Sequence, residues 1–288
     1  MNVEQWKARG AVHTIHGRRI FAVDTGGGDD KPTLLILHGY PTSSHDYHHV
    51  LPDLAARFRV IVHDHLGFGL SDKPKDYSFA LMEQTDFALL LWQALGVKSA
   101  HVVAHDYGTS LATELLARWN LGFRPIQLHS ITLSNGSVHI ELARLRLIQK
   151  LLRNETLGPV VARLTSQRVF NRNMRQLWHD PSTLPDAELD AMWELLIRDD
   201  GKATLPKLTQ YLRDRVLFWN RWVGALRQSQ LPLGFLWGAE DPITGRDIAN
   251  VHHAESPGSR LTVLDNVGHY PMIEAPRRWT DGLLAMLP

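Results

Sequence analysis

Short apolar runs alternate with amphipathic segments along most of the chain. The predicted strands lie at residues 33–37, 59–63, 100–103, 126–133, 233–237 and 260–264. Most are continuously apolar, which is typical of parallel strands that are buried on both faces. Helical periodicity is found at residues 46–58, 81–95, 107–119 and 276–287. This alternation predicts an α/β protein with a mostly parallel, doubly wound sheet and right-handed crossovers.

The pattern changes between residues 137 and 230, where helical periodicity dominates and no convincing strand is predicted. We therefore expect a core formed by residues 1–136 and 231–288 and an inserted helical cap domain formed by residues 137–230. Two alternating segments predict a hairpin over residues 12–23. The glycine-rich stretch 25–32 predicts a surface loop, because its spacing does not match a phosphate-binding loop.

The composition excludes several classes of protein. With 31 basic and 30 acidic residues the net charge is +1, which gives no general reason to expect nucleic acid or an anionic membrane as a partner. The absence of cysteine excludes disulfides and a thiol nucleophile. No apolar run reaches the roughly 20 residues of a membrane span, and the first residues lack the apolar core of a signal peptide. We therefore expect a soluble, cytoplasmic protein, either a monomer or a homodimer.

The segment 100–110 carries the first candidate for chemistry. An apolar run ends at Asp106, and the small residues Ala104 and Gly108 lie two positions on either side. Small flanking residues are what the sharp strand-to-helix turn of a nucleophile elbow requires, because bulkier ones would clash there. A carboxylate at the apex can attack a saturated carbon without a base to activate it. Taken alone, the segment fits equally well a helix-capping Asp after a buried strand.

Two further polar residues follow predicted strands in the same way. Asp241 comes just after the strand at 233–237, and His269 comes after the strand at 260–264. Open α/β sheets build their sites at the carboxyl ends of strands. Singly, Asp241 fits a helix start and His269 fits a loop histidine. Together with Asp106 they give the order nucleophile, acid and histidine, which favours a catalytic triad.

The chain resembles the Asp-nucleophile branch of the α/β-hydrolases, which contains epoxide hydrolases and haloalkane dehalogenases. The resemblance covers nearly the whole chain. Within this branch, the chain is most similar to the mesoderm-specific transcript protein subfamily. The resemblance is carried by His38-Gly39-Tyr40-Pro41, Asp72-Lys73-Pro74, His105-Asp106-Tyr107-Gly108, Leu133-Ser134-Asn135-Gly136, Arg221-Trp222-Val223-Gly224, Gly238-Ala239-Glu240-Asp241-Pro242 and Gly268-His269.

The resemblance implies a two-step hydrolysis. Asp106 would form an alkyl-enzyme ester, and His269, oriented by Asp241, would activate the water that hydrolyses the ester. Backbone N–H groups of Tyr40 and Tyr107 would form the oxyanion hole. No cofactor and no metal are expected, and the substrate expected beside water is a small, largely apolar organic molecule. Adjacent residues point apart on a helix, so the pairs at 48–49 and 252–253 are predicted to be surface histidines.

The leaving group distinguishes the two chemistries of this branch. Dehalogenases hold halide with an indole after the nucleophile and a second N–H donor, and this chain has Tyr107 and Tyr40 at the corresponding places. Epoxide hydrolases protonate the departing oxygen, generally with two cap tyrosines. Tyr211 resembles the later of the two, and a second tyrosine is absent from residues 137–230. Epoxide opening is therefore the preferred hypothesis. A haloalkane dehalogenase-like hydrolase and a weakly catalytic ligand-binding protein of the same fold are the alternatives.

Polar side chains of the insertion near Tyr211 have simpler interpretations. The Tyr211 hydroxyl could equally lie in water on an amphipathic helix. Arg213, Arg215 and Arg221 add positive charge that would suit an anionic substrate, but a solvated helix face explains them more simply.

Overall fold

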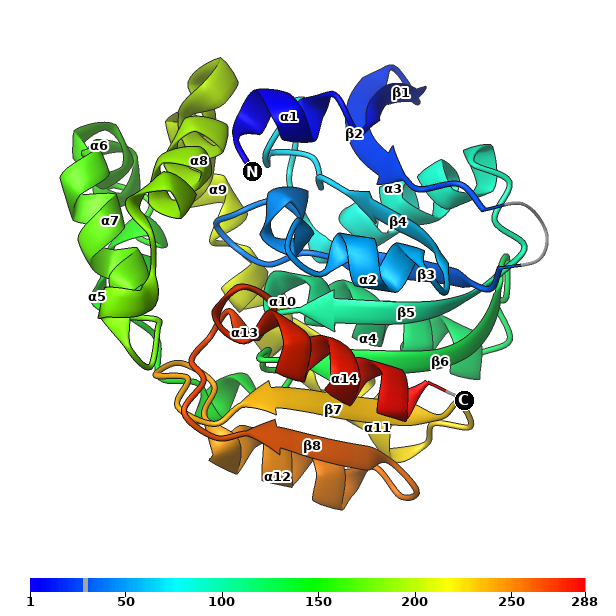
Figure 1. Ribbon diagram of the computed structural model, residues 1–288. Helices are drawn as coiled ribbons and strands as arrows, with labels where there is room; N and C mark the ends of the chain where they lie inside the picture. Colours follow the sequence, from blue (N-terminus) through cyan, green and yellow to red (C-terminus); the bar gives the residue numbers. More distant parts are fainter. Residues whose placement is uncertain (28–30, 288) are drawn as a thin grey trace.

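A single eight-stranded sheet organises the protein (Figure 1). The computed structural model describes residues 1–27 and 31–287, so the loop expected at 25–32 lies partly outside the described residues. The strands are β1 (Ala11–Ile15), β2 (Arg18–Asp24), β3 (Thr33–Leu37), β4 (Arg59–His63), β5 (Ser99–His105), β6 (Gln127–Ser134), β7 (Leu233–Gly238) and β8 (Arg260–Leu264). All six strands predicted from the apolar runs and the N-terminal hairpin are confirmed.

The sheet has the order β1-β2-β4-β3-β5-β6-β7-β8. β1 pairs antiparallel with β2, and β2 pairs antiparallel with β4. All the other pairs are parallel, so the expected mostly parallel sheet is confirmed. Because β3, β5, β7 and β8 run in the same direction, their carboxyl ends meet at one edge of the sheet. The segments that follow these strands carry the candidate site.

Helices cover both faces of the sheet, with α14 in front and α4 behind it in the view of Figure 1. The helices of this part are α1 (Val3–Lys7), η1 (Ser44–Tyr47), α2 (Leu51–Ala55), α3 (Leu81–Ala94), α4 (Tyr107–Asn120), α12 (Arg246–Glu255), α13 (Pro271–Glu274) and α14 (Pro276–Met286). The short helix α12 was not predicted from periodicity. It supplies the crossover that parallel pairing of β7 with β8 requires.

The predicted helix at 46–58 is wrong as a continuous element. The 3₁₀ helix η1 occupies its beginning, and α2 starts anew at Leu51, with Pro52 in its first turn. A continuous helix would place Pro52 in its interior, where it lacks an N–H and its ring clashes with the carbonyl four residues earlier. The chain is therefore divided at this point.

Helices connect β6 to β7 without an intervening strand among the residues that the structure describes. They are η2 (Ile140–Leu142), α5 (Leu147–Leu152), α6 (Leu157–Leu164), α7 (Gln167–Arg175), η3 (Pro181–Thr183), α8 (Asp186–Ile197), η4 (Arg198–Thr204), α9 (Leu205–Leu208), α10 (Tyr211–Leu217) and α11 (Trp219–Arg227). Figure 1 shows α5 to α8 beyond the arrowheads of the strands, whereas α11 packs along α4. We call α5 to α8 the helical layer.

Apolar side chains of both parts pack into one core. Leu35 of β3, Leu111 of α4 and Leu208 of α9 are all fully or almost fully buried in the same cluster. Among the described residues, no helix has the combination of length and apolar character needed to cross a bilayer.

Candidate active site

Asp106 stands at a strained turn between β5 and α4. Its backbone angles are φ 42° and ψ −104°, a conformation that residues with a side chain rarely adopt. The N–H of Gly108 donates to the His38 carbonyl at 3.1 Å, and a Cβ at position 108 would press into the Leu37 carbonyl. Only glycine therefore lets α4 start so close to β3. This close approach and the strained turn are the geometry that the small flanking residues predict.

The structure brings Asp106, Asp241 and His269 together. His269 Nδ1 lies 2.7 Å from Asp241 Oδ2, and His269 Nε2 lies 3.9 Å from Asp106 Oδ2. Each follows a different strand of the sheet, namely β5, β7 and β8. All three are buried, and Asp106 is 5% exposed. The imidazole thus lies between two carboxylates, with one ring nitrogen facing each.

Asp241 is held as a carboxylate by donors on three sides. Asn135 Nδ2 donates to Asp241 Oδ2 at 2.9 Å, the Ile243 N–H donates to Oδ1 at 2.8 Å, and the Thr244 hydroxyl also donates to Oδ2. Burial would raise the pKa of Asp241, but the nearby His269 and these hydrogen bonds hold it well below its usual range. Sequence reasoning missed Asn135 as a site residue. Its position directly after β6 was the available signal.

His269 is the basic group of the site. Burial alone would lower its pKa, but the Asp241 carboxylate raises the pKa above the ordinary value, with a smaller contribution from Asp106. The His269 carbonyl accepts a hydrogen bond from His105 Nε2 at 2.7 Å. Burial lowers the pKa of His105 to about 3, so this second histidine is neutral and carries its proton on Nε2. Its role is to hold the His269 backbone in place.

Tyr40 contacts the Asp106 carboxylate, and Tyr107 follows Asp106 in the chain. The Tyr40 N–H donates to Asp106 Oδ2 at 3.1 Å. Tyr107 is the first residue of α4, where N–H groups have no acceptor within the helix. The two predicted oxyanion-hole residues therefore lie beside the nucleophile candidate, and the Tyr40 N–H already contacts one of its oxygens.

Arg215 is a site residue that sequence reasoning misplaced. The solvated-face interpretation suits Arg213, which is exposed, but it is wrong for Arg215, which is 2% exposed. Arg215 donates from Nε to the Ser110 hydroxyl at 2.8 Å and from an Nη to the Asp106 carbonyl at 2.8 Å. The same nitrogen lies 3.7 Å from Asp106 Oδ1. This buried cation lies beside the elbow and ties α10 to α4 through the Ser110 hydroxyl and the Asp106 carbonyl.

Arg221 is paired inside the fold. Its guanidinium donates to the Glu114 carboxylate of α4 at 2.7 Å and 2.9 Å. The charge of Arg221 is therefore neutralised by the protein itself, and an anionic substrate is not needed to explain it.

Replacing Arg215 by Met is expected to lower turnover about 10- to 100-fold, because the Asp106 carbonyl and carboxylate lose a charge-assisted partner. Arg215→Lys should recover part of this loss, since it keeps the charge but not the forked geometry. Steady-state kinetics of both variants, with Arg213→Met as the exposed control, make the comparison. Equal turnover in Arg215→Met and wild type would remove this arginine from the site.

Asp106 and His269 both line a cavity that is largely enclosed by the helical layer. Tyr40 and Gln149 contribute polar groups to its wall. Most of the remaining wall is apolar and comes from Ile148, Leu152, Phe170, Met174, Leu196 and Leu205. Such a wall binds small apolar molecules by removing their surface from water.

Tyr211 is buried in contact with Tyr40 and Gln149, two residues that line this cavity. Its ring centroid lies 5.6 Å from that of Tyr40 and 5.3 Å from that of Tyr107. The side chain is 1% exposed, so the interpretation that places its hydroxyl in water is wrong. The hydroxyl accepts from Gln149 Nε2 at 3.1 Å.

Two of the histidines expected on the surface are buried. His48 is 5% exposed and His252 is 1% exposed. His48 packs against His45 in the segment that follows β3, and His252 stacks on Phe235 of β7 at 5.6 Å between ring centroids. The pairwise argument failed because only one histidine of each pair needs to face outward.

Buried neutral histidines predict loss of stability in acid. Burial lowers the pKa of His63, His105 and His252 to about 3. In the unfolded chain these histidines bind protons near pH 6.5, whereas in the folded protein they stay neutral down to about pH 3. The free energy of unfolding is therefore highest above about pH 6.5 and decreases as the pH falls toward 3. Urea unfolding from about pH 7 to about pH 4 should show this decline. His252→Phe, which removes no hydrogen bond, should flatten it, whereas an unchanged slope would contradict the assignment.

Comparison with known proteins identifies the class. The family model for the alpha/beta hydrolase fold matches residues 32–276, and the chain therefore belongs to the α/β-hydrolase fold family. It is 40% identical over 286 residues to the protein named "Putative hydrolase LipZ" from Mycobacterium tuberculosis, covering 99% of this chain and 98% of LipZ. It is 35% identical over 295 residues to the mesoderm-specific transcript protein of Mus musculus, covering 99% of this chain and 88% of that protein. The resemblance proposed from the motifs is confirmed.

Solved structures show the same fold. A loop variant of the haloalkane dehalogenase DbeA-M1 from Bradyrhizobium elkanii superposes with a TM-score of 0.81 at 22% identity, covering 96% of this chain and 95% of that chain. Cfl2 from Burkholderia cenocepacia superposes with a TM-score of 0.81 at 20% identity, covering 97% and 95%. At these identities the likeness concerns the fold and not the reaction.

Proposed function

We propose that this α/β-hydrolase opens epoxides through a covalent ester on Asp106. The observation that carries the proposal is the position of His269, whose Nδ1 is bound to Asp241 while its Nε2 lies 3.9 Å from Asp106 Oδ2. In the proposal, His269 Nε2 faces the Asp106 carboxyl group and activates the water that attacks its carbon. A carboxylate at the elbow forms the ester without help from a base, and the histidine is needed only to hydrolyse that ester.

In the first step an Asp106 carboxylate oxygen attacks a ring carbon of the epoxide. The ring C–O bond breaks, its electron pair goes to the epoxide oxygen, and this oxygen takes the proton of the Tyr211 hydroxyl. In the second step His269 Nε2 takes a proton from water as the water oxygen attacks the carboxyl carbon of Asp106. The N–H groups of Tyr40 and Tyr107 stabilise the resulting oxyanion.

The tetrahedral intermediate then collapses and breaks the bond between the Asp106 carboxyl carbon and the product oxygen. The departing alkoxide takes the hydroxyl proton of the intermediate, and the diol and the Asp106 carboxylate result. The proton on His269 returns through solvent to the Tyr211 phenolate. The sum is one epoxide and one water converted to one diol, with no cofactor.

The hydrogen bonds around Tyr211 support its role as the acid. Gln149 Oε1 accepts from the Arg146 N–H at 2.8 Å, which orients the amide so that its NH₂ group faces Tyr211. The phenol oxygen is therefore an acceptor in that contact, and its own hydrogen is free to be donated to a substrate. Burial raises the pKa of Tyr211, so the phenol keeps its proton until the alkoxide forms.

Dehalogenation is the second reaction that an Asp106 ester would permit. The indole that this reaction uses after the nucleophile is replaced by Tyr107, which favours epoxide opening.

We further propose that residues 137–230 act as the cap that closes the cavity and selects small apolar substrates, because α5, α7 and α8 supply much of the cavity wall.

Tyr211→Phe is expected to reduce epoxide turnover about 100-fold or more, because the epoxide oxygen would leave without a proton. Tyr77→Phe is the matched control, since its hydroxyl is also buried but has no hydrogen-bond partner. Turnover of styrene oxide by both variants, followed by diol formation, makes the measurement. Unchanged turnover in Tyr211→Phe would show that another group protonates the epoxide.

A parallel assay of three substrates tests the reaction class. Styrene oxide, butyl bromide and p-nitrophenyl acetate would each be incubated with wild type and with His269→Gln. We expect diol from styrene oxide as the main product of the wild type. Bromide release without diol formation would assign the dehalogenase alternative, and binding without turnover of any of the three would favour the ligand-binding alternative.

A further inference from the structure

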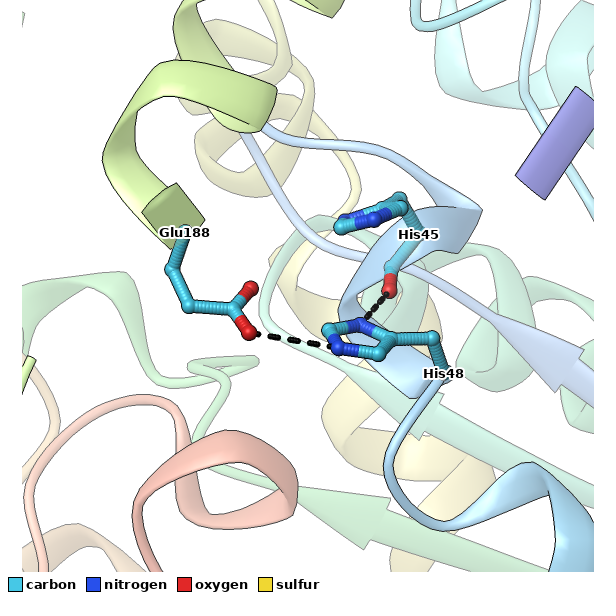
Figure 2. A group of neighbouring side chains, drawn as sticks. All are labelled: His45, His48 and Glu188. Carbon is cyan, nitrogen blue, oxygen red and sulfur yellow. Dashed lines mark hydrogen bonds and ion pairs between the residues drawn. The ribbon is translucent and has the colours of Figure 1, made fainter. Parts of the chain in front are cut away.

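A second cluster of polar side chains joins the core to the helical layer. His45 lies in η1, His48 follows it directly, and Glu188 lies in α8 (Figure 2). One ring nitrogen of each histidine and one carboxylate oxygen of Glu188 lie within 4.8 Å of one another. Figure 2 shows the Glu188 side chain reaching from α8 toward His48, with the His45 ring beside it. None of these residues belongs to the site around Asp106.

Backbone carbonyls fix the protons of both histidines. His45 Nε2 lies 2.9 Å from the Met1 carbonyl, and His48 Nδ1 lies 2.9 Å from the His45 carbonyl. A carbonyl only accepts, so each of these nitrogens carries the hydrogen. In the neutral rings the lone pairs are then on His45 Nδ1 and His48 Nε2. Metal-binding histidines are oriented by carbonyls in this way.

The lone pairs are poorly satisfied without a cation. His45 Nδ1 and Glu188 Oε2 are buried and have no hydrogen-bond partner. His48 Nε2 lies 3.2 Å from Glu188 Oε1, so an acceptor faces a carboxylate unless a proton or a metal ion lies between them. The Met1 amino nitrogen, 3.3 Å from His48 Nε2, is the nearest competing donor. His45 is 1% exposed and Glu188 is 7% exposed, which makes unpaired atoms costly.

We propose that His45, His48 and Glu188 bind a zinc ion that clamps α8 to η1. Two imidazoles and a carboxylate are a donor set that Zn²⁺ prefers. Zinc bonds of about 2.0–2.1 Å place neighbouring ligand atoms roughly 3.3 Å apart, so the cluster would close by about 1.5 Å. The fourth position is open to water or to His49, whose Nε2 lies 2.8 Å from Glu188 Oε1.

Zinc binding is tested on the untagged protein after treatment with a chelator. Titration with ZnCl₂ against a chromophoric competitor is expected to show one tight equivalent, and the thermal midpoint should rise with zinc concentration. Glu188→Gln and His48→Gln should each weaken this binding at least about 100-fold. His253→Gln, which removes an exposed histidine, is the control and should bind as wild type does.

A spectrum of the wild-type protein keeps the test independent of how the variants fold. One equivalent of Co²⁺ should give the intense visible bands of a tetrahedral site, and Zn²⁺ should abolish them. Failure of the wild type to bind one tight equivalent would overturn the proposal. So would a tight equivalent that survives in both folded variants. Neither result depends on whether Asp106 forms an ester.

Discussion

Asp106→Asn is expected to abolish epoxide turnover, with a loss of about 10⁴-fold or more. The amide has nearly the shape of the carboxylate but lacks the charge and nucleophilicity that attack on a saturated carbon requires. Asn tolerates positive φ better than other residues with a side chain, which suits the φ of 42° at this turn. The measurement is diol formation from styrene oxide with enzyme in excess, so that even a single turnover would be seen.

The control for Asp106→Asn is a comparison of its folding with that of a variant changed at an exposed position. Circular dichroism and the urea midpoint of Asp106→Asn should be close to those of the reference variant Arg213→Met, which alters only an exposed side chain. If a well-folded Asp106→Asn protein turned over styrene oxide nearly as fast as the wild type, another group would have to attack the substrate.

His269→Gln is expected to stop the reaction halfway. Asp106 keeps its contact with the Tyr40 N–H, so ester formation should continue, but no base remains to activate water. One equivalent of styrene oxide per enzyme should be consumed in a burst, after which turnover falls about 10³-fold or more. Mass spectrometry of the peptide that contains Asp106 should show the mass of the whole epoxide added to that residue.

The pH dependence of the wild type provides an independent check of the same step. Because His269 must be neutral to accept a proton and its pKa is raised above the ordinary value, ester hydrolysis should decline below that raised pKa. Ester formation should continue in the same range, so the ester should accumulate in mildly acidic solution.

A His269→Gln protein that neither consumes epoxide nor carries an adduct would contradict the division of the reaction into ester formation by Asp106 and ester hydrolysis by His269.

The sheet and the meeting of the three candidate residues could be predicted from local sequence. Buried parallel strands are recognisable because they are apolar without alternation, and the residues that follow them meet at one edge of the sheet. Asp106, Asp241 and His269 come together for that reason. The order of the three along the chain, with glycine two positions after Asp106, was sufficient to place them.

The surroundings of these residues could not be predicted, because they depend on packing between distant segments. Arg215 looks like one of several helical arginines in sequence, and only the packing of α10 on α4 turns it toward Asp106. Asn135 becomes a partner of Asp241 only through the pairing of β6 with β7. His48 was misplaced for the same reason, because its partner Glu188 lies far along the sequence, in α8.

Single turnover in water labelled with ¹⁸O tests most directly whether Asp106 forms an ester. Wild-type enzyme in excess over styrene oxide would be quenched after one turnover, and the diol and the peptide containing Asp106 would be analysed by mass spectrometry. An ester on Asp106 predicts an unlabelled diol, because its new oxygen comes from the carboxylate, and one ¹⁸O atom in Asp106. Label in the diol and none in Asp106 would show that water attacks the epoxide directly, which would contradict the proposed mechanism.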